Sequence, residues 1–248
     1  MKAAVVYGVN DLRLEEVEKP QIERDDQILV KIKAVGICGS DIHILHGANP
    51  FATYPRIMGH EMVGEVEAVG DNVKNTAIGD HIVVEPITYC GKCYACRKGM
   101  PNVCQQLKVS GVHVDGGMRE YIVIAEKQAH KIKKDIPWTT AVLAEPYTIA
   151  GNVTTRTNIS AGDKVVIQGA GPIGITILRM AKVKGATVLV TDMVDEKLAF
   201  AKENGADMVV NPSKENLIEA VKTWTDGEMA NVVIDAACTP KTFEICFD

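Results

Sequence analysis

Residues 164–174 read KVVIQGAGPIG, a run of β-branched residues that leads directly into a turn with three glycines. The first glycine, Gly169, allows a tight turn, and the second, Gly171, leaves room for another group to approach the backbone. Gly174 permits a helix to pack closely on the preceding strand. Pro172 suits the first turn of that helix, where no backbone N–H donor is needed. The order of strand, glycine turn and helix predicts a parallel α/β unit.

A second strand follows this helix. The helical pattern keeps its apolar residues on one face and ends at Gly185, and TVLVTD then forms a buried strand that ends on Asp192. A glycine turn, a helix N-terminus and an acid about 20 residues downstream are typical of a site for the pyrophosphate and ribose of NAD. A carboxylate in this position would also repel the extra phosphate of NADP. The predicted cofactor-binding residues are Gly169, Gly171, Pro172, Ile173, Gly174 and Asp192.

The pattern along the chain changes near residue 150, which predicts two domains, residues 1–150 and residues 151–248. Short β-rich runs separated by Gly and Pro dominate the first domain, whereas strands alternate with helical segments in the second. Strands are expected at residues 2–7, 27–35, 62–70, 81–86, 119–124, 164–168, 187–192, 208–210 and 231–236, and a helix around residues 137–157. A doubly wound sheet has six strands. Because the second domain has room for about four of the six, we expect a truncated sheet.

The charge and hydropathy of the chain limit its partners. The net charge is 27 − 32 = −5 and no Lys/Arg run occurs, which argues against nucleic acid or an anionic membrane as a partner. The first residues lack a signal-peptide pattern, and no uncharged apolar stretch reaches the length of about 18 residues that a membrane helix needs. We therefore expect a cytoplasmic protein with a small-molecule partner. Clustered cysteines bind metal more often than they form disulfides in that compartment.

Residues 90–104 read CGKCYACRKGMPNVC and hold four of the seven cysteines. Bacterial ferredoxins use similar steps, so an iron–sulfur cluster is the rival interpretation. Their run ends C-x3-C-P, however, whereas the last cysteine here lies farther along the chain and precedes Gln105. Four thiolates suit a closed, tetrahedral and structural zinc site better. The predicted ligands are Cys90, Cys93, Cys96 and Cys104.

Chemistry at a metal requires a separate, open site. Cys38 in GICGSDIH and His60 in GHEMVGEV supply a thiolate and an imidazole. Glu61 and Glu145 are acids in apolar surroundings, where a carboxylate is costly unless it is paired or bound to metal. The residue before Pro146 is biased away from helix, so Glu145 should lie at a helix boundary. Taken singly, each of these residues is more often a core, surface or hydrogen-bonded residue than a ligand.

In chain order, GICGSDIH, GHEMVGEVEAVG, the four-cysteine segment, GGMREY and GAGPIG make the whole sequence resemble the zinc-containing medium-chain alcohol dehydrogenases. The resemblance implies an α/β protein with a GroES-like β-rich catalytic domain and a truncated Rossmann domain, and two Zn²⁺ per chain together with NAD as cofactors. It also implies that Cys38, His60 and Glu145 surround the catalytic zinc. Glu61 is an adjacent or alternative ligand in the polyol-dehydrogenase branch.

The same resemblance implies roles for residues near the expected zinc. Ser40 would contact the reacting hydroxyl, His43 would continue a proton relay, and Asp41 would orient His60. Glu145 stands where many alcohol dehydrogenases have a cysteine, which favours the sorbitol-like branch.

Within that branch the sequence most resembles the L-gulonate and L-galactonate 5-dehydrogenases, through HGANPFATYPRIMGHE, SGVHVDGGMREY and EPYTIAGNVT. The expected function is zinc- and NAD-dependent oxidation of a secondary hydroxyl of a sugar acid or polyol to a ketone, in a homo-oligomer for the complete relative. A truncated, inactive zinc-binding remnant and a zinc or iron–sulfur regulatory module are the alternatives. Arg56, His113 and Arg119 are candidates to meet a substrate carboxylate, and a structural role fits each at least as well.

Overall fold

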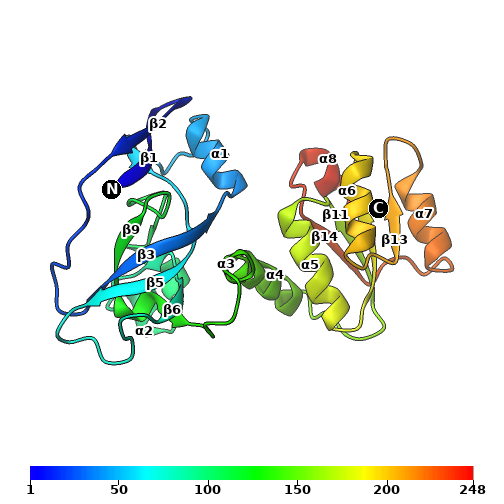
Figure 1. Cartoon of the computed structure of the whole chain (residues 1–248). Helices are drawn as coiled ribbons and strands as arrows, with labels where there is room; N and C mark the ends of the chain where they lie inside the picture. The colour runs from blue at the N-terminus through cyan, green and yellow to red at the C-terminus, as the bar shows by residue number, and fades with distance from the viewer. Residues whose placement is uncertain (248) are drawn as a thin grey trace. The chain divides into compact units, whose positions relative to one another are not determined.

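The computed structural model describes residues 1–247, which form two compact units, Met1–Glu145 and residues 146 onward (Figure 1). The predicted boundary after residue 150 lies a few residues farther along the chain, inside helix α4 (Ala144–Arg156). The single helix predicted around residues 137–157 is two helices, α3 (Trp138–Ala141) and α4. The second helix restarts with Pro146 in its first turn, where a missing N–H is tolerated and where a continuous helix would lose a hydrogen bond.

The first unit is built from antiparallel strands. Its strands are β1 (Lys2–Gly8), β2 (Asp11–Glu16), β3 (Gln27–Gly36), β4 (Arg56–Ile57), β5 (Glu61–Val69), β6 (His81–Val84), β7 (Ile87–Thr88), β8 (Lys108–Val109), β9 (Tyr121–Ala125) and β10 (Ala129–Lys131). They form a five-stranded sheet in the order β10-β6-β5-β3-β9, a three-stranded sheet β2-β1-β4 and a hairpin β7-β8. Its short helical elements are α1 (Gly39–Leu45), α2 (Tyr94–Arg97), η1 (Pro101–Val103) and η2 (Glu126–Gln128).

Alternating side chains of the five-stranded sheet form the main core of this unit. Ile28 and Val30 of β3, Met62 of β5, Ile82 of β6 and Ile122 of β9 are buried together. Their spacing of two residues along β3 is the period of a strand with one face turned to the core. The core fixes the register of β3 against β5, and with it the positions of the residues at the ends of both strands.

The second unit contains a parallel sheet, as the sequence predicts. Its elements are β11 (Lys164–Gln168), α5 (Pro172–Val183), β12 (Thr187–Thr191), α6 (Asp195–Glu203), β13 (Met208–Val210), α7 (Leu217–Trp224), β14 (Val232–Asp235) and α8 (Pro240–Ile245). The strand order β13-β12-β11-β14 is that of the first four strands of a doubly wound fold, 3-2-1-4. The direction of winding therefore reverses between β11 and β14, the position at which such sheets bind ligands.

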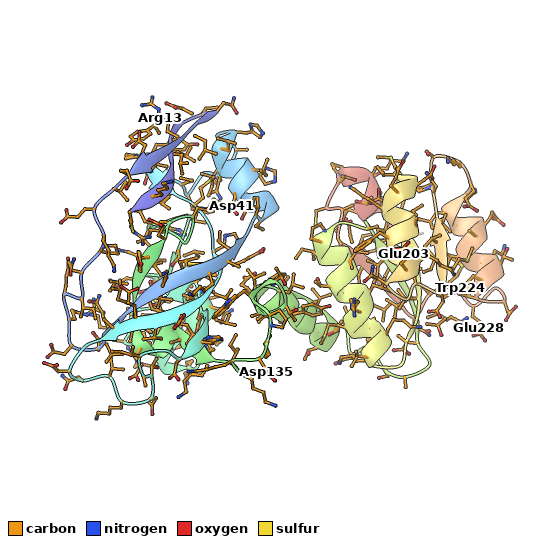
Figure 2. All side chains as sticks on the ribbon, viewed as in Figure 1. Arg13, Asp41, Asp135, Glu203, Trp224 and Glu228 are labelled. Atoms are coloured by element: carbon orange, nitrogen blue, oxygen red, sulfur yellow. The ribbon has the colours of Figure 1, made fainter. Side chains whose placement is uncertain are left out.

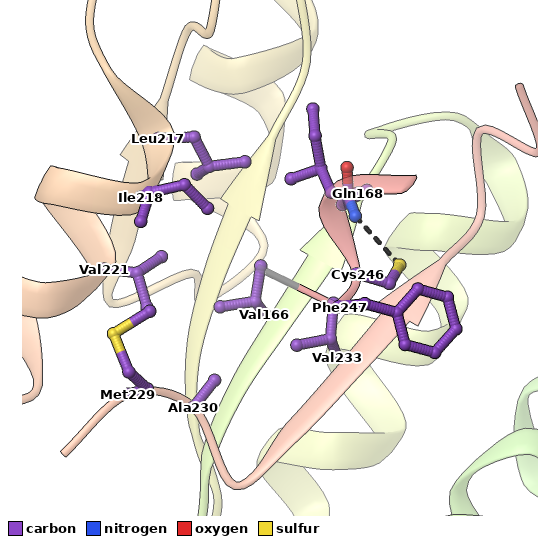
Figure 3. Close-up of a pocket in the computed structure, with 11 residues that line it drawn as sticks. Val166, Gln168, Leu217, Ile218, Val221, Met229, Ala230, Val233, Cys246 and Phe247 are labelled. Atoms are coloured by element: carbon purple, nitrogen blue, oxygen red, sulfur yellow. Dashed lines mark hydrogen bonds between the residues drawn. The ribbon is translucent and has the colours of Figure 1, made fainter. Parts of the chain in front are cut away.

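Helices cover both faces of this sheet. Ile177 of α5 and Ala201 of α6 pack in one apolar cluster, whereas Leu217 and Val221 of α7 pack in another. Beside α7 and α8 lies a mostly apolar cavity of about 170 Å³ (Figure 3). Gln168 and Cys246 are among the residues that line it, and the side-chain amide of Gln168 donates to Cys246 Sγ. None of the helices described for residues 1–247 is long and apolar enough to cross a membrane.

The glycine turn has the geometry that its sequence predicts. Gly169 has a φ of +101°, which an L-residue with a side chain rarely adopts. A Cβ on Gly174 would lie 1.9 Å from the carbonyl oxygen of Gly169, so α5 can start this close to β11 only because residue 174 is glycine. Pro172 is the first residue of α5, and Gly171 precedes it in an extended conformation.

Candidate metal centres and cofactor site

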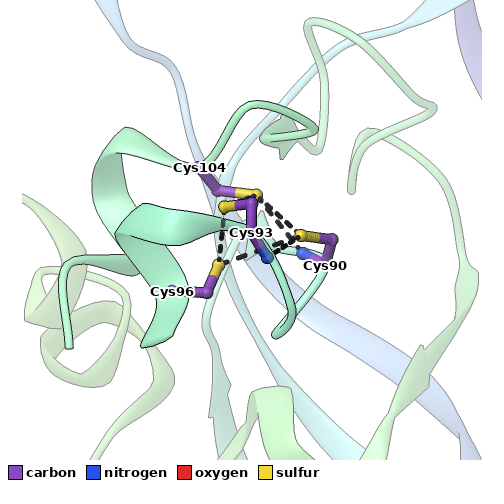
Figure 4. Close-up of side chains that lie close together, drawn as sticks. All are labelled: Cys90, Cys93, Cys96 and Cys104. Atoms are coloured by element: carbon purple, nitrogen blue, oxygen red, sulfur yellow. Dashed lines mark hydrogen bonds between the residues drawn. The ribbon is translucent and has the colours of Figure 1, made fainter. Parts of the chain in front are cut away.

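The four cysteines of residues 90–104 come together in one lobe (Figure 4). Cys93 caps the N-terminus of α2, Cys96 lies within α2, and Cys104 directly follows η1. Their Sγ atoms are 3.5 Å apart for Cys93 and Cys96, 3.8 Å for Cys93 and Cys104, 3.5 Å for Cys104 and Cys90, and 4.0 Å for Cys90 and Cys96. All four sulfurs therefore surround one point.

These distances fit a single tetrahedral ion. Four sulfurs at the Zn–S distance of about 2.3 Å from a tetrahedral centre would be about 3.8 Å from one another. Backbone N–H groups of Cys93 and Gln106 also point at the sulfurs of Cys90 and Cys104, at 3.3 Å each. Such donors stabilise thiolates. An iron–sulfur cluster would spread the four sulfurs over two or four irons, and the set is too compact for that.

The unequal pKa values of the thiols in this lobe fit a site that a cation would complete. The backbone N–H of Cys96 lowers the pKa of Cys93 to about 6, whereas partial burial and the neighbouring thiol of Cys93 raise the pKa of Cys96 to about 12. Without a metal the four groups cannot all be thiolates at neutral pH, because each added negative charge opposes the next. A divalent ion removes that conflict, so these residues fit a bound zinc.

A second cluster joins Cys38, His60 and Glu61, whose ligand atoms lie within 4.8 Å of one another. Cys38 follows β3 and caps the N-terminus of α1, and His60 directly precedes β5. Strands β3 and β5 pair with Gly36 opposite Glu61. The antiparallel pairing therefore brings the end of one strand to the start of the other, which places a thiol, an imidazole and a carboxylate together.

Asp41 holds the backbone around this cluster. It lies in the first turn of α1 (Figure 2) and is fully buried, and one carboxylate oxygen accepts from the backbone N–H of Cys38 at 2.9 Å. The other oxygen accepts from the N–H of Gly59 at 3.2 Å. It is 3.8 Å from Nδ1 of His60, too far for a hydrogen bond. The resemblance implies that Asp41 orients the imidazole, and in the structure it positions the two segments that carry Cys38 and His60.

The electrostatics of the cluster match an open cation site. Hydrogen bonding to Cys38 raises the pKa of His60 to about 9, and the same contact lowers the pKa of the Cys38 thiol. Burial raises the pKa of both Glu61 and Glu145. Nδ1 of His60 is buried without a hydrogen-bond partner in residues 1–247. A cation at this point would compensate the thiolate and both carboxylates, so the residues fit the metal that they are predicted to hold.

Glu145 is near this cluster and outside its tightest part. It lies in the first turn of α4, at the helix boundary that Pro146 predicts. Its carboxylate interacts electrostatically with His60 and Glu61, but the group within 4.8 Å contains Glu61 and not Glu145. The geometry therefore favours Glu61 as the carboxylate of the compact set and leaves Glu145 as an outer or alternative ligand.

Gly36 is a residue of the site that the sequence reasoning missed. A Cβ on Gly36 would lie 1.8 Å from Oε2 of Glu61, so the carboxylate lies directly over this glycine. A glycine inside a strand often marks a close approach of this kind. The glycine at the end of the predicted strand, two residues before Cys38, was therefore a signal that the sequence contained.

We expect Gly36→Ala to displace the Glu61 carboxylate. The far end of this side chain can rotate away, so the free energy of unfolding should fall by only about 1 kcal/mol. Zinc affinity of the Cys38 cluster should fall about 10- to 100-fold, the usual effect of disturbing groups that support a metal site. Zinc competition with a chelator measures this. Gly8→Ala is the control, since its Cβ meets no atom within 4 Å; equal zinc affinity in both variants would contradict the expectation.

The residues predicted for proton transfer lie on α1. The hydroxyl and backbone N–H of Ser40 interact with the Cys38 thiol and help to lower its pKa. His43 is exposed and lies three residues farther along the same helix, a spacing that puts two side chains on one face. The helix thus carries both residues predicted for proton transfer, Ser40 beside the Cys38 thiol and His43 at the surface of the first unit.

The predicted cofactor residues gather at the carboxyl ends of β11 and β12. Gly171 has no atom within 4 Å of the position that a Cβ would take, so the turn is open on that side. Asp192 follows β12, and its carboxylate accepts from the N–H of Ala170 at 2.9 Å and from the N–H of Val194 at 3.0 Å. This acid therefore ties the glycine turn to the second strand, and each oxygen retains a lone pair for another donor.

Comparison with known proteins places both units. Residues 24–134 match the family model of the alcohol dehydrogenase GroES-like domain, and residues 172–248 match that of the zinc-binding dehydrogenases. The chain is 44% identical to the starvation-sensing protein RspB of Escherichia coli K12, over 97% of this chain and 70% of that protein. It is 39% identical to L-threonine 3-dehydrogenase of Pyrococcus abyssi, over 98% of this chain and 70% of that protein.

Solved structures share the fold. The crystal structure of an rspB alcohol dehydrogenase from E. coli CFT073 in complex with NADH matches with a TM-score of 0.89 and 43% identity, over 97% of this chain and 70% of that one. Other relatives carry the names sorbitol dehydrogenase and L-galactonate-5-dehydrogenase. The relatives named as dehydrogenases thus differ in the substrate.

Proposed function

This chain belongs to the family of zinc-dependent alcohol dehydrogenases, and from that premise we propose that it oxidises a secondary hydroxyl of a sugar acid or polyol to a ketone with zinc and NAD. The observation that carries the proposal is the cluster of Cys38, His60 and Glu61. A thiolate, an imidazole and a carboxylate form a ligand set that leaves a position open for substrate, in contrast to the closed set of four cysteines.

The cofactors would divide the chemistry. Zinc held by Cys38, His60 and a carboxylate of Glu61 or Glu145 would supply Lewis acidity to a hydroxyl, and NAD would supply the hydride acceptor. Ser40 would accept the proton of the hydroxyl at its Oγ as it releases its own proton toward His43. His43 would pass that proton to water, because it is exposed on the same helix. Asp41 would keep Cys38 and His60 in place during the reaction.

The proposed substrate class comes from the names of the relatives. A relative named L-galactonate-5-dehydrogenase supports a sugar acid, and a relative named sorbitol dehydrogenase supports a polyol. The L-threonine 3-dehydrogenases are relatives of similar identity, so L-threonine is the competing substrate. We propose a cytoplasmic location on separate grounds, since Cys238 and Cys246, which belong to neither metal site, are free thiols and suit a reducing compartment.

A substrate screen tests the proposed function. Zinc-loaded protein is incubated with NAD or NADP and with L-galactonate, L-gulonate, sorbitol or L-threonine, and the formation of NADH or NADPH is followed by its absorbance. We expect turnover with a sugar acid or polyol and NAD. Turnover of L-threonine alone would show that the substrate is an amino acid and not a sugar acid or polyol, and that the reaction is still the oxidation of a secondary hydroxyl. Binding of NADH without turnover of any substrate would favour the zinc-binding remnant instead.

The open side of the glycine turn provides a test of the cofactor site. We expect Gly171→Ala to fold normally, because its Cβ would meet no protein atom within 4 Å and its φ of −73° suits any residue. The methyl group would occupy the space proposed for the pyrophosphate and weaken NADH binding about 10- to 100-fold. Titration of NADH fluorescence measures the affinity.

Gly151→Ala is the matched control for this variant. It also meets no atom within 4 Å, and it lies in α4. An unchanged NADH affinity in both variants would remove the glycine turn from the proposed site.

A further inference from the structure

A cavity of about 250 Å³ lies in the first unit between β1, β4 and the segment of residues 115–119. Tyr7 of β1, Glu18, Arg56 of β4, Asp115 and Arg119 are among the residues that line it. None of the candidate metal ligands lines this cavity. It is therefore separate from the candidate metal centres. Its two arginines, Arg56 and Arg119, are the ones that the sequence offered as candidates to meet a substrate carboxylate.

One of the two arginines is ion-paired, although its Nε, like that of Arg119, is buried without a hydrogen-bond partner in residues 1–247. Arg56 donates from one terminal nitrogen to Asp115 at 2.9 Å and from the other to the hydroxyl of Thr53 at 2.9 Å. Its side chain is only 13% exposed, whereas that of Asp115 is 44% exposed. Asp115 also accepts from the backbone N–H of Ile57. The charge of Arg56 is thus neutralised within the protein.

The other arginine has no partner. The side chain of Arg119 makes no hydrogen bond and no ion pair with any of residues 1–247, and its Nε is buried without an acceptor. Burial lowers the pKa of Arg119, and the attraction of Asp115 opposes this only in part. Burying this Nε without an acceptor is costly, because its N–H has lost water and gained no partner.

We propose that this cavity binds a small carboxylate or phosphate anion, with Arg119 as the cation that holds it. The charges support a single negative group: Arg56 is neutralised by Asp115, and Glu18 is exposed to solvent. The planar fork of a guanidinium suits the paired oxygens of a carboxylate or phosphate. Since a water takes about 30 Å³ of liquid volume, the cavity has room for such an anion together with several waters.

The position of the cavity links it to the chain around His60. The segment that ends at Arg119 is hydrogen-bonded along the segment that starts at Arg56: Gly116 donates to Ile57 at 2.7 Å and Met118 to Met58 at 2.9 Å. The two arginines therefore lie at the two ends of one paired stretch. This site lies outside the proposed reaction, and its test does not depend on that reaction.

Thermal unfolding of the full-length, zinc-loaded chain tests the proposal. Sodium acetate and inorganic phosphate are titrated in separate arms, each against sodium chloride at the same ionic strength. At ten times its Kd, a bound anion should raise Tm by about 3 °C over chloride. The arm that responds identifies carboxylate or phosphate as the ligand. No rise over chloride in either arm overturns the proposal without any variant.

Arg119→Met and Arg13→Met form a matched pair of variants. Both remove one positive charge, but Arg13 is exposed, pairs with Asp11 on β2 and does not line the cavity. We expect Arg119→Met to weaken anion binding at least tenfold and Arg13→Met to leave it unchanged. Equal binding in the wild type and Arg119→Met overturns the proposal.

The Tm of Arg119→Met, measured without added anion, distinguishes a role of Arg119 in anion binding from a purely structural role. Removing an uncompensated buried charge should leave the Tm of Arg119→Met equal to that of the wild type or higher. A purely structural arginine would instead give a lower Tm in every buffer and the same anion response, and that result overturns the proposal.

Discussion

Replacing Cys38 with serine is expected to remove one metal ion from the protein and to abolish its dehydrogenase activity. The Cys38 thiol is the one soft ligand in the cluster with His60 and Glu61, and a serine hydroxyl is a much weaker ligand for zinc. Loss of a Lewis acid that supplies several kcal/mol lowers turnover about 1,000-fold or more. Elemental analysis and the NADH assay measure the two effects.

The four-cysteine lobe makes the expected loss selective. It shares no residue with the Cys38 cluster, so the variant should retain the metal of the lobe. The zinc content should therefore fall by one ion per chain and not to zero. Cys238→Ser is the matched control, because Cys238 is an exposed free thiol in the second unit. Full zinc content and full turnover in Cys38→Ser would refute the assignment of the catalytic metal.

The parts of the fold that could be predicted are those that a local pattern specifies. The turn at Gly169 and the packing at Gly174 follow from the loss of a side chain where the backbone has no room for one. The buried strands β11 and β12, and strand β14, of which Ile234 alone is buried, follow from runs of β-branched residues. Such features depend on neighbours in sequence, which a single chain displays.

Short elements held by distant partners could not be predicted. Strands β4 and β7 have two residues each, and β2 is mostly polar and pairs only at the edge of its sheet. Neither the period of apolar residues nor their propensity marks such segments. The break between α3 and α4 also escaped prediction, because an amphipathic pattern continues across it.

The candidate site shows the same division. Cys38, His60 and Glu61 could be selected by residue type and by resemblance, and the structure brings them within 4.8 Å. The place of Glu61 over Gly36 depends on the register of β3 against β5. The two backbone contacts of Asp41 depend on how α1 meets the loop before His60. Register and loop geometry are tertiary properties, so the supporting residues were less visible than the ligands.

The four-cysteine lobe yields the second large effect, because little besides a metal can hold it. Within residues 89–109, Cys104 alone is buried, and Tyr94, Met100 and Val103 are between 44% and 63% exposed. None of the five apolar clusters includes a buried residue of this segment. Structural zinc sites supply about 10–16 kcal/mol to segments that would otherwise be unfolded.

Cys96→Ser is therefore expected to unfold the lobe and to leave the rest of the first unit folded. The five-stranded sheet has its own core around Ile28 and Met62, so hydrogen exchange should stay slow in β3 and β5. Exchange should become fast in residues 89–107. Trypsin should cut after Lys92, Arg97 and Lys98 about 100 times faster or more, because cleavage follows the population of the open form.

A matched substitution and a chelator distinguish the metal from the thiol. Cys246→Ser also removes one partly buried thiol, but it lies beside α8 in the second unit, and it should leave tryptic cleavage of the lobe unchanged. Chelation of the wild-type protein should reproduce the Cys96→Ser cleavage pattern, and added zinc should reverse it in the wild type alone. A lobe that resists trypsin after complete removal of metal would mean that contacts of the chain itself hold it, and that zinc binds a structure already formed.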